Sequence, residues 1–145
     1  MSELTLEKAQ AIVAAALAHA RGAGMKPLAV AVLDARGVLK TFAAEDGTPL
    51  RRAEIAQGKA HGAVAMGMGS RALARTATER PHFVAAITHA VGGSLVPVPG
   101  GVLINSGTGV LLGAVGISGD TSDNDEAAAL AGIKAAGFAA DPGAG

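Results

Sequence analysis

A lysine, four histidines and a group of acidic residues are the side chains of this sequence that could carry out chemistry. Lys59 lies among small apolar residues in a segment with helical spacing. In such surroundings a lysine reaches solvent, pairs with a carboxylate or points into a cleft. In a cleft it would act as a general acid or base, and the carboxylates considered as its partner are Asp46, Asp125 and Glu126.

The histidines are His19, His61, His82 and His89. His61 lies about 200° around a helix from Lys59, so these two side chains do not share a pocket on the same face. His82 and His89 are seven residues apart, which places them on one helical face but too far apart for one metal ion. Taken singly, each histidine is expected in a structural or exposed position.

Residues 113–126 join a strand pattern to an acidic helix start. Ser118 nearly completes a nucleophile elbow, but Asp120 replaces the final glycine of that motif. We therefore interpret Ser118 as a turn or ligand-contacting residue. The turn at Gly119 would present backbone N–H groups and the positive end of the following helix to an anionic ligand group.

The composition excludes several classes of protein. The 145 residues fit a single domain, residues 1–145, that is large enough for a hydrophobic core. The absence of cysteine excludes disulfides and thiolate catalysis. A net charge of zero and the lack of Trp and Tyr argue against nucleic-acid binding. Apolar runs are too short for a membrane helix and no secretion signal is seen, so a cytoplasmic location is expected.

Charge is unevenly distributed along the chain. Residues 51–80 are predominantly basic, whereas the segment after Gly119 is predominantly acidic. Such polarity suits an anionic small ligand or self-association between unlike faces. Surfaces rich in Ala and Gly, with few charges, also favour packing between copies, so a homo-oligomer is expected.

Hydrophobic periodicity predicts an α/β fold of the α+β type. Gly58 and Gly62, inside a predicted helix, indicate close backbone packing or the approach of a ligand. The predicted helices begin at Leu6, Arg52, Ser70, Pro81 and Ser122 or Asp123, and end near Gly22 or Gly24, Met68, Ala77, Val91 and Phe138. The predicted strands are residues 28–33, 38–43, 95–98, 102–105 and 110–117.

Five short features together resemble the GlcG/HbpS-like family: LTLEKA at residues 4–9, Lys59 in GKA, the glycine pair of residues 99–101, GAVGISG at residues 113–119 and the pair Asp125-Glu126. The resemblance covers nearly the whole chain. It implies a profilin-like, largely antiparallel five-stranded sheet flanked by helices, in the order helix, two strands, helices, three strands, helix. It also implies haem binding or haem breakdown, or an accessory role in small-acid catabolism, and an oligomeric protein.

The leading hypothesis is therefore binding of haem or a related anionic small ligand. The expected ligand-binding residues are Arg51, Arg52, Lys59, Arg71, Ser118 and Gly119, and the basic side chains among them would meet propionates. If haem binds, the candidate iron ligands are His61, His82 and His89, with Met66 and Met68 as weaker candidates.

Two alternatives belong to other classes of function. One is a small-molecule enzyme acting on an oxo- or hydroxy-acid, with Lys59 or a histidine as acid or base; its candidate catalytic residues are Lys59, His61, Asp125 and Glu126. The other is an oligomeric accessory protein without chemistry of its own. If Lys59 serves a ligand, Lys59→Met is expected to weaken binding or turnover with nearly unchanged thermal stability.

Overall fold

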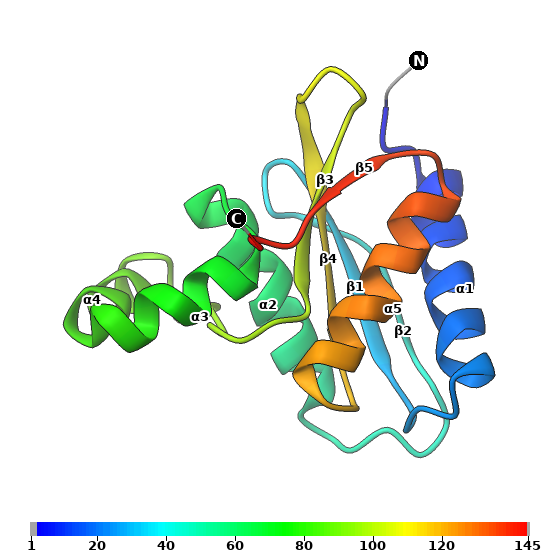
Figure 1. The fold of residues 1–145 in the computed structure, drawn as a ribbon, viewed down its shortest axis with the longest axis horizontal. Helices are drawn as coiled ribbons and strands as arrows, with labels where there is room; N and C mark the ends of the chain where they lie inside the picture. The colour runs from blue at the N-terminus through cyan, green and yellow to red at the C-terminus, as the bar shows by residue number, and fades with distance from the viewer. Residues whose placement is uncertain (1–2, 145) are drawn as a thin grey trace.

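The computed structural model describes residues 3–144 as one five-stranded sheet with helices on both faces (Figure 1). In chain order the elements are α1 (Leu6–Gly22), β1 (Ala29–Asp34), β2 (Leu39–Ala44), α2 (Arg52–Met66), α3 (Ser70–Glu79), α4 (Pro81–Ala90), β3 (Gly101–Asn105), β4 (Leu111–Ser118), α5 (Ser122–Ala135) and β5 (Ala139–Asp141). The strand order is β2-β1-β4-β3-β5 and every neighbouring pair is antiparallel. The predicted α+β fold with a five-stranded antiparallel sheet is confirmed.

The fifth strand is not the one predicted at residues 95–98. That segment is irregular because Val96 donates its backbone N–H to Gly58 of α2, and Pro97 and Pro99 have no N–H for a ladder. The fifth strand is β5 at the C-terminal end, which pairs with β3. The observed order of elements therefore differs from the predicted one.

The last helix is also shorter than predicted, since α5 ends at Ala135 and not near Phe138. Gly137 has φ +83 and donates its N–H to Lys134, while Phe138 donates its N–H to Ile133. This pair of hydrogen bonds is a Schellman motif, which needs a residue that tolerates positive φ. The motif turns the chain out of the helix and into β5.

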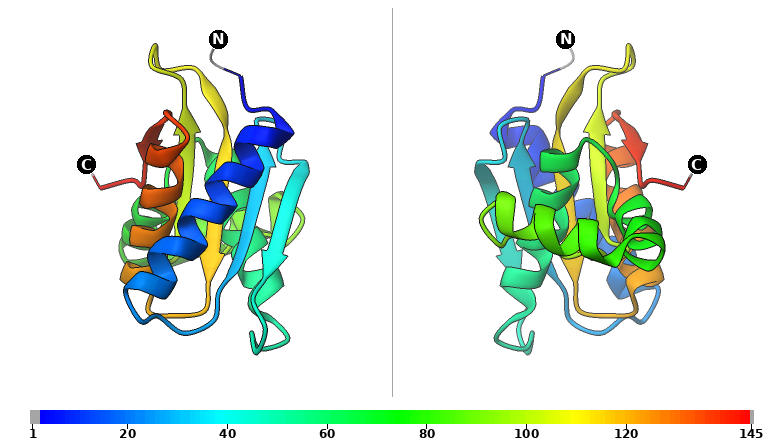
Figure 2. Two further views of the ribbon diagram at one scale, coloured as in Figure 1. Left: turned by 90° about the vertical axis from the view of Figure 1, so that its right-hand side faces the viewer. Right: turned by 90° about the vertical axis from the view of Figure 1, so that its left-hand side faces the viewer.

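Alternate residues of the central strands enter two different cores. Val30, Val32, Val102 and Val115 pack with α1 and α5 on one face of the sheet. Ala29, Ala31, Leu33, Leu103 and Ala114 pack against α2 on the other face. Figure 2 shows α1 and α5 together on one side and α2, α3 and α4 on the opposite side. The period of two along each strand therefore assigns the helices to separate layers.

The face of the sheet under α2 carries small residues, so α2 lies unusually close to the strands. A Cβ on Gly116 of β4 would lie 1.9 Å from the Ala56 carbonyl oxygen of α2. A Cβ on Gly101 of β3 would lie 2.2 Å from the Lys59 carbonyl oxygen. This close contact explains the Ala- and Gly-rich composition of these segments.

Helices α3 and α4 form a hairpin that projects from the body of the molecule (Figure 1). Their contact is maintained by a separate cluster that contains Leu73, Val84 and Leu95. Met66, Met68 and Phe83 pack around this cluster. No helix within residues 3–144 is both long enough and apolar enough to cross a membrane.

Candidate functional site

Lys59 and Asp125 form a buried ion pair that connects the two helical layers. The Nζ–Oδ2 distance is 3.2 Å, and the side chains are only 2% and 1% exposed. Lys59 Nζ also donates a hydrogen bond of 2.8 Å to the carbonyl oxygen of Ile117. Of the three carboxylates considered as its partner, Asp125 is the one that contacts Lys59.

Glycines at the start of β3 make room for the Lys59 side chain. A Cβ on Gly100 would lie 2.8 Å from Lys59 Nζ, and Gly100 has φ +125. The other carboxylate oxygen of Asp125 accepts the Asp120 backbone N–H at 2.9 Å. Burial lowers the pKa of the Lys59 ammonium and raises the pKa of the Asp125 carboxyl, and their mutual attraction opposes both shifts. Both charged groups thus have partners inside the protein, and Nζ is almost fully buried.

Arg71 joins α3 to α5 through two carboxylates. Its Nε and Nη2 donate to the two oxygens of Glu126 at 3.0 and 3.1 Å, and Nη2 also bonds Asp123. These hydrogen bonds raise the pKa of the Arg71 guanidinium. Glu126 is therefore engaged by Arg71 and not by Lys59.

The remaining basic residues of the expected ligand-binding set also have partners. Arg51 donates to Glu54 at 2.7 Å on the surface, and Arg52 donates to the Ser118 hydroxyl at 3.1 Å. A Cβ on Gly119 would lie 2.2 Å from the Pro27 carbonyl oxygen, so close packing against the backbone at Pro27 explains this glycine. The structure thus distributes the expected cluster among separate polar contacts, and a role for these residues in ligand binding stays a prediction.

Asp120, the residue after Gly119, should make the stability of the protein depend on pH in the acid range. Its carboxylate accepts the Lys26 backbone N–H at 2.9 Å and the Asn124 side-chain N–H at 2.7 Å, which lowers its pKa to about 2. A lowered pKa gives stability that is present above the unfolded value of 3.8 and is lost as the pH falls towards about 2.

We therefore expect Asp120→Asn to be less sensitive to acid than the wild type. Between about pH 4 and about pH 2, the unfolding free energy of the variant should fall less steeply in urea titrations. Asp46→Asn is the matched control, since within residues 3–144 the exposed Asp46 carboxylate has no hydrogen bond or ion pair. If the unfolding free energies of the wild type and Asp120→Asn fell in parallel with pH, the lowered pKa assigned to Asp120 would be wrong.

His61 of α2 is oriented by a backbone carbonyl. Its Nδ1 lies 2.7 Å from the Ser94 carbonyl oxygen. A carbonyl oxygen can only accept, so Nδ1 carries the proton and Nε2 of the neutral ring carries the lone pair. Within residues 3–144 Nε2 has no hydrogen-bond partner, and it is not sealed from solvent. Donation of one ring N–H to a carbonyl is the usual arrangement of a histidine that binds a metal through its other nitrogen.

The turn between β1 and β2 leaves space beside this nitrogen. A Cβ on Gly37 would lie 3.2 Å from Cδ2 and 3.6 Å from Nε2 of His61. The next two residues expose apolar side chains, Val38 by 51% and Leu39 by 45%. Arg36, in the same turn, is 80% exposed and makes only a 3.4 Å pair with Asp34. The turn that contacts the His61 ring through Gly37 therefore also carries exposed apolar side chains and an exposed cation.

The other candidate iron ligands lie elsewhere. His82 and His89 are exposed on α4, and His19 is exposed on α1. Met66 and Met68 pack around the cluster between α3 and α4. No group of three His, Asp or Glu side chains in residues 3–144 is arranged to hold a metal ion.

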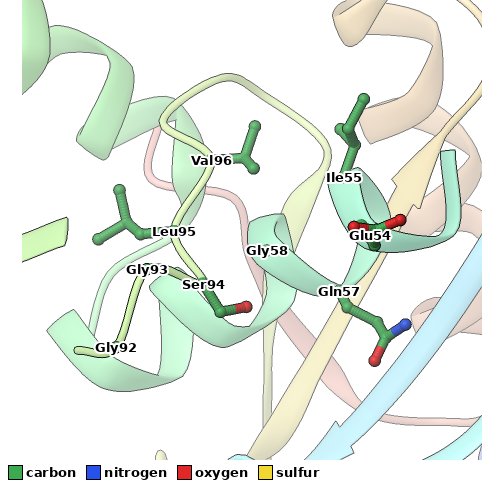
Figure 3. Close-up of a pocket in the computed structure, with 9 residues that line it drawn as sticks. All are labelled: Glu54, Ile55, Gln57, Gly58, Gly92, Gly93, Ser94, Leu95 and Val96. Carbon is green, nitrogen blue, oxygen red and sulfur yellow. The ribbon is translucent and has the colours of Figure 1, made fainter. Parts of the chain in front are cut away.

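A cavity of about 500 Å³ lies between α2 and residues 92–96. Figure 3 shows Gly58, Gln57, Ile55 and Glu54 along α2 and the loop with Ser94 and Val96 beside them. The interior glycines of α2 allow this contact, because a Cβ on Gly58 would lie 2.6 Å from Val96 Cγ2, and one on Gly62 would lie 2.9 Å from Leu95 Cγ. The sequence predicted close backbone packing or the approach of a ligand at these glycines, but the loop and its bond to His61 were not predicted. Gly92-Gly93 was the only signal of a turn there.

Comparisons with known proteins agree on one family. The family model described as "Haem degrading protein HbpS-like" matches residues 4–134. A search of curated protein sequences found no match.

Solved structures give three informative matches. The structure of a PduOC–haem complex is 25% identical, with a TM-score of 0.84, and the alignment covers 94% of this chain and 97% of that one. A double mutant of Streptomyces reticuli HbpS is 27% identical, with a TM-score of 0.78 and coverage of 92% and 87%. The Klebsiella pneumoniae protein ORFY is 20% identical with a TM-score of 0.83 and coverage of 94% and 92%, which supports the fold alone.

Proposed function

Because the chain belongs to the family of HbpS-like haem degrading proteins, we propose that it binds haem, or a related anionic tetrapyrrole, on the face that α2 shares with the β1–β2 turn. The similarity to PduOC, whose structure contains haem, supports this proposal at the level of the family. The contacts of His61 support it at the level of this chain.

The observation that carries the proposal is the hydrogen bond from His61 Nδ1 to the Ser94 carbonyl oxygen. It fixes the ring and leaves Nε2, which carries the lone pair, as the ring nitrogen without a hydrogen-bond partner among the described residues. The missing side chain at Gly37 keeps the approach to Nε2 open. His61 would therefore supply an imidazole nitrogen to the iron, as histidine does in many haem proteins.

The surrounding turn provides suitable contacts for the rest of the ligand. Val38 and Leu39 would cover part of the apolar ring, which otherwise lacks aromatic partners in a chain with only three Phe and no Trp or Tyr. Arg36 would pair with a propionate, because its exposed contact with Asp34 is weak and easily exchanged. Bound haem would supply a redox-active iron, and the role of these residues is to hold and orient it.

We expect purified protein titrated with hemin to show a saturable shift of the Soret band. His61→Ala should weaken binding by at least about tenfold, since even changes to residues that orient a metal ligand commonly cost 10–100-fold. His82→Ala is the matched control and should bind as the wild type does. Electron paramagnetic resonance of the ferric complex should show an imidazole ligand in the wild type that is lost in His61→Ala.

Absence of saturable binding by the wild type would refute the proposed function. Thermal melts of both variants separate a loss of ligand from a loss of fold, because His61→Ala also removes the contact with Ser94.

Acid–base catalysis with Lys59 has no supporting observation in the geometry, because Nζ is enclosed by Asp125 and the Ile117 carbonyl. The role of Lys59 is better explained by its buried ion pair. Self-association and a cytoplasmic location stay predictions from the sequence, as does the accessory role in catabolism.

A further inference from the structure

The cavity between α2 and residues 92–96 is distinct from the surface around His61 Nε2. His61 Nδ1 faces Ser94, whereas Nε2 lies beside Gly37 of the β1–β2 turn. The cavity is lined by Glu54, Ile55, Gln57 and Gly58 of α2 and by residues 92–96 of the loop. Its volume of about 500 Å³ is within the range typical of small-molecule sites, roughly 300–1,000 Å³.

The lining divides into an apolar part and a polar part. Ile55, Leu95 and Val96 provide branched aliphatic side chains. In the view of Figure 3, Ser94 and Gln57 lie below Val96 and Ile55, and Glu54 lies between Ile55 and Gln57. Ser94 Oγ has no hydrogen-bond partner in the described part of the chain and is not sealed from solvent. This hydroxyl is therefore available to a ligand.

The charge of the lining selects against anions. Glu54 contributes a carboxylate, Gln57 an amide and Ser94 a hydroxyl, and no Lys, Arg or His lines the cavity. The Glu54 carboxylate has an exposed partner, Arg51, and an exposed ion pair of this kind is weak and exchangeable. A group that donates hydrogen bonds, above all an ammonium, therefore complements this lining better than a carboxylate or phosphate.

We propose that this cavity is a second ligand site, which binds a small amphipathic molecule with an amine or hydroxyl group at one end and an aliphatic tail at the other. The amine end bonds Glu54, Gln57 and Ser94, and the tail packs on Ile55 and Val96. The site does not depend on the proposed haem function.

Ser94 couples this cavity to His61. Its side chain lines the cavity, while its carbonyl oxygen accepts the bond that orients the histidine ring. A ligand that displaces residues 92–96 would therefore also displace the His61 ring. Any effect of a molecule in the cavity on binding at the Nε2 surface would be matched by an equal effect in the reverse direction.

The site can be tested in the apoprotein with two probes that share one tail. Leucinol carries an amine and a hydroxyl on an isobutyl group, and 4-methylpentanoate carries a carboxylate on the same group. In ¹H–¹⁵N spectra, leucinol should shift the amide signals of Gly58, Ser94 and Val96 saturably, together with the side-chain nitrogens of His61. The carboxylate should produce no saturable shift. Equal responses to both probes, or none to leucinol, would overturn the proposal.

A pair of matched variants locates the amine. Glu54→Gln should weaken leucinol binding about tenfold, which is the loss expected for one hydrogen bond to a charged group. Glu79→Gln, at the exposed end of α3, should have no effect. Unchanged affinity in a folded Glu54→Gln protein would exclude the assigned contact. Failure of hemin binding would leave all of these results unaffected, so the two proposals fail separately.

Discussion

Lys59→Met is expected to lower the free energy of unfolding by about 3–5 kcal/mol, the usual cost of breaking a buried ion pair on one side. The substitution retains much of the apolar stem but leaves Asp125 as an uncompensated carboxylate that is only 1% exposed. The Ile117 carbonyl also loses its donor. Urea or thermal denaturation measures the effect directly.

Two further variants make this result specific. Lys134→Met, in the exposed last turn of α5, is the matched control and should change stability by less than about 0.5 kcal/mol. Lys59→Met combined with Asp125→Asn should recover part of the loss, because the buried charge is removed while an oxygen remains for the Asp120 N–H. A stable Lys59→Met protein with weakened ligand binding, as expected from the sequence alone, would mean that the pair is not formed in solution.

The second large effect is expected at Gly116. In Gly116→Ala the new Cβ would lie 1.9 Å from the Ala56 carbonyl oxygen and 2.8 Å from the Ala60 nitrogen, both in the backbone of α2. Backbone atoms inside a helix cannot move aside as a flexible side chain can, so α2 as a whole must shift. We expect a loss of at least about 3 kcal/mol, at the upper end of overpacking effects, or failure to fold.

Gly107→Ala is the matched control for this substitution. No atom lies within 4 Å of a Cβ at Gly107, in the turn between β3 and β4, and its φ is not in the left-handed region. Its effect should be neutral or slightly stabilising, since alanine restricts the unfolded chain. If both alanine variants were equally stable, the close contact of α2 with the sheet would be wrong.

The sequence predicted the elements whose side chains repeat with a clear period. The hairpin of β1 and β2, the strands β3 and β4 and the five helix starts all carry local signals in the form of turns, caps and alternating apolar residues. β5 has only three residues, Ala139–Asp141, with no β-branched side chain, so no period could reveal it. Residues 95–98 were predicted as a strand that is not formed, because an apolar run can pack against a helix as well as in a sheet.

The candidate site shows the same division between local and long-range information. The family resemblance drew attention to Lys59 and Asp125, and the structure brings them together across 66 residues of chain. The orientation of His61 depends on a backbone carbonyl 33 residues away and on the missing side chain of Gly37. Backbone acceptors and empty space leave no residue pattern, which explains why the sequence left His61, His82 and His89 together as candidate iron ligands.

The buried pair Lys59–Asp125 also has a consequence for cooperativity. α2 and α5 lie on opposite faces of the sheet, and both pack on β3 and β4. If either helix detaches alone, it exposes its own apolar face. It also leaves the buried charge of the other helix without its partner. Partial opening of one layer therefore carries two free-energy costs, and we expect the two layers to exchange amide hydrogens and to unfold as one unit.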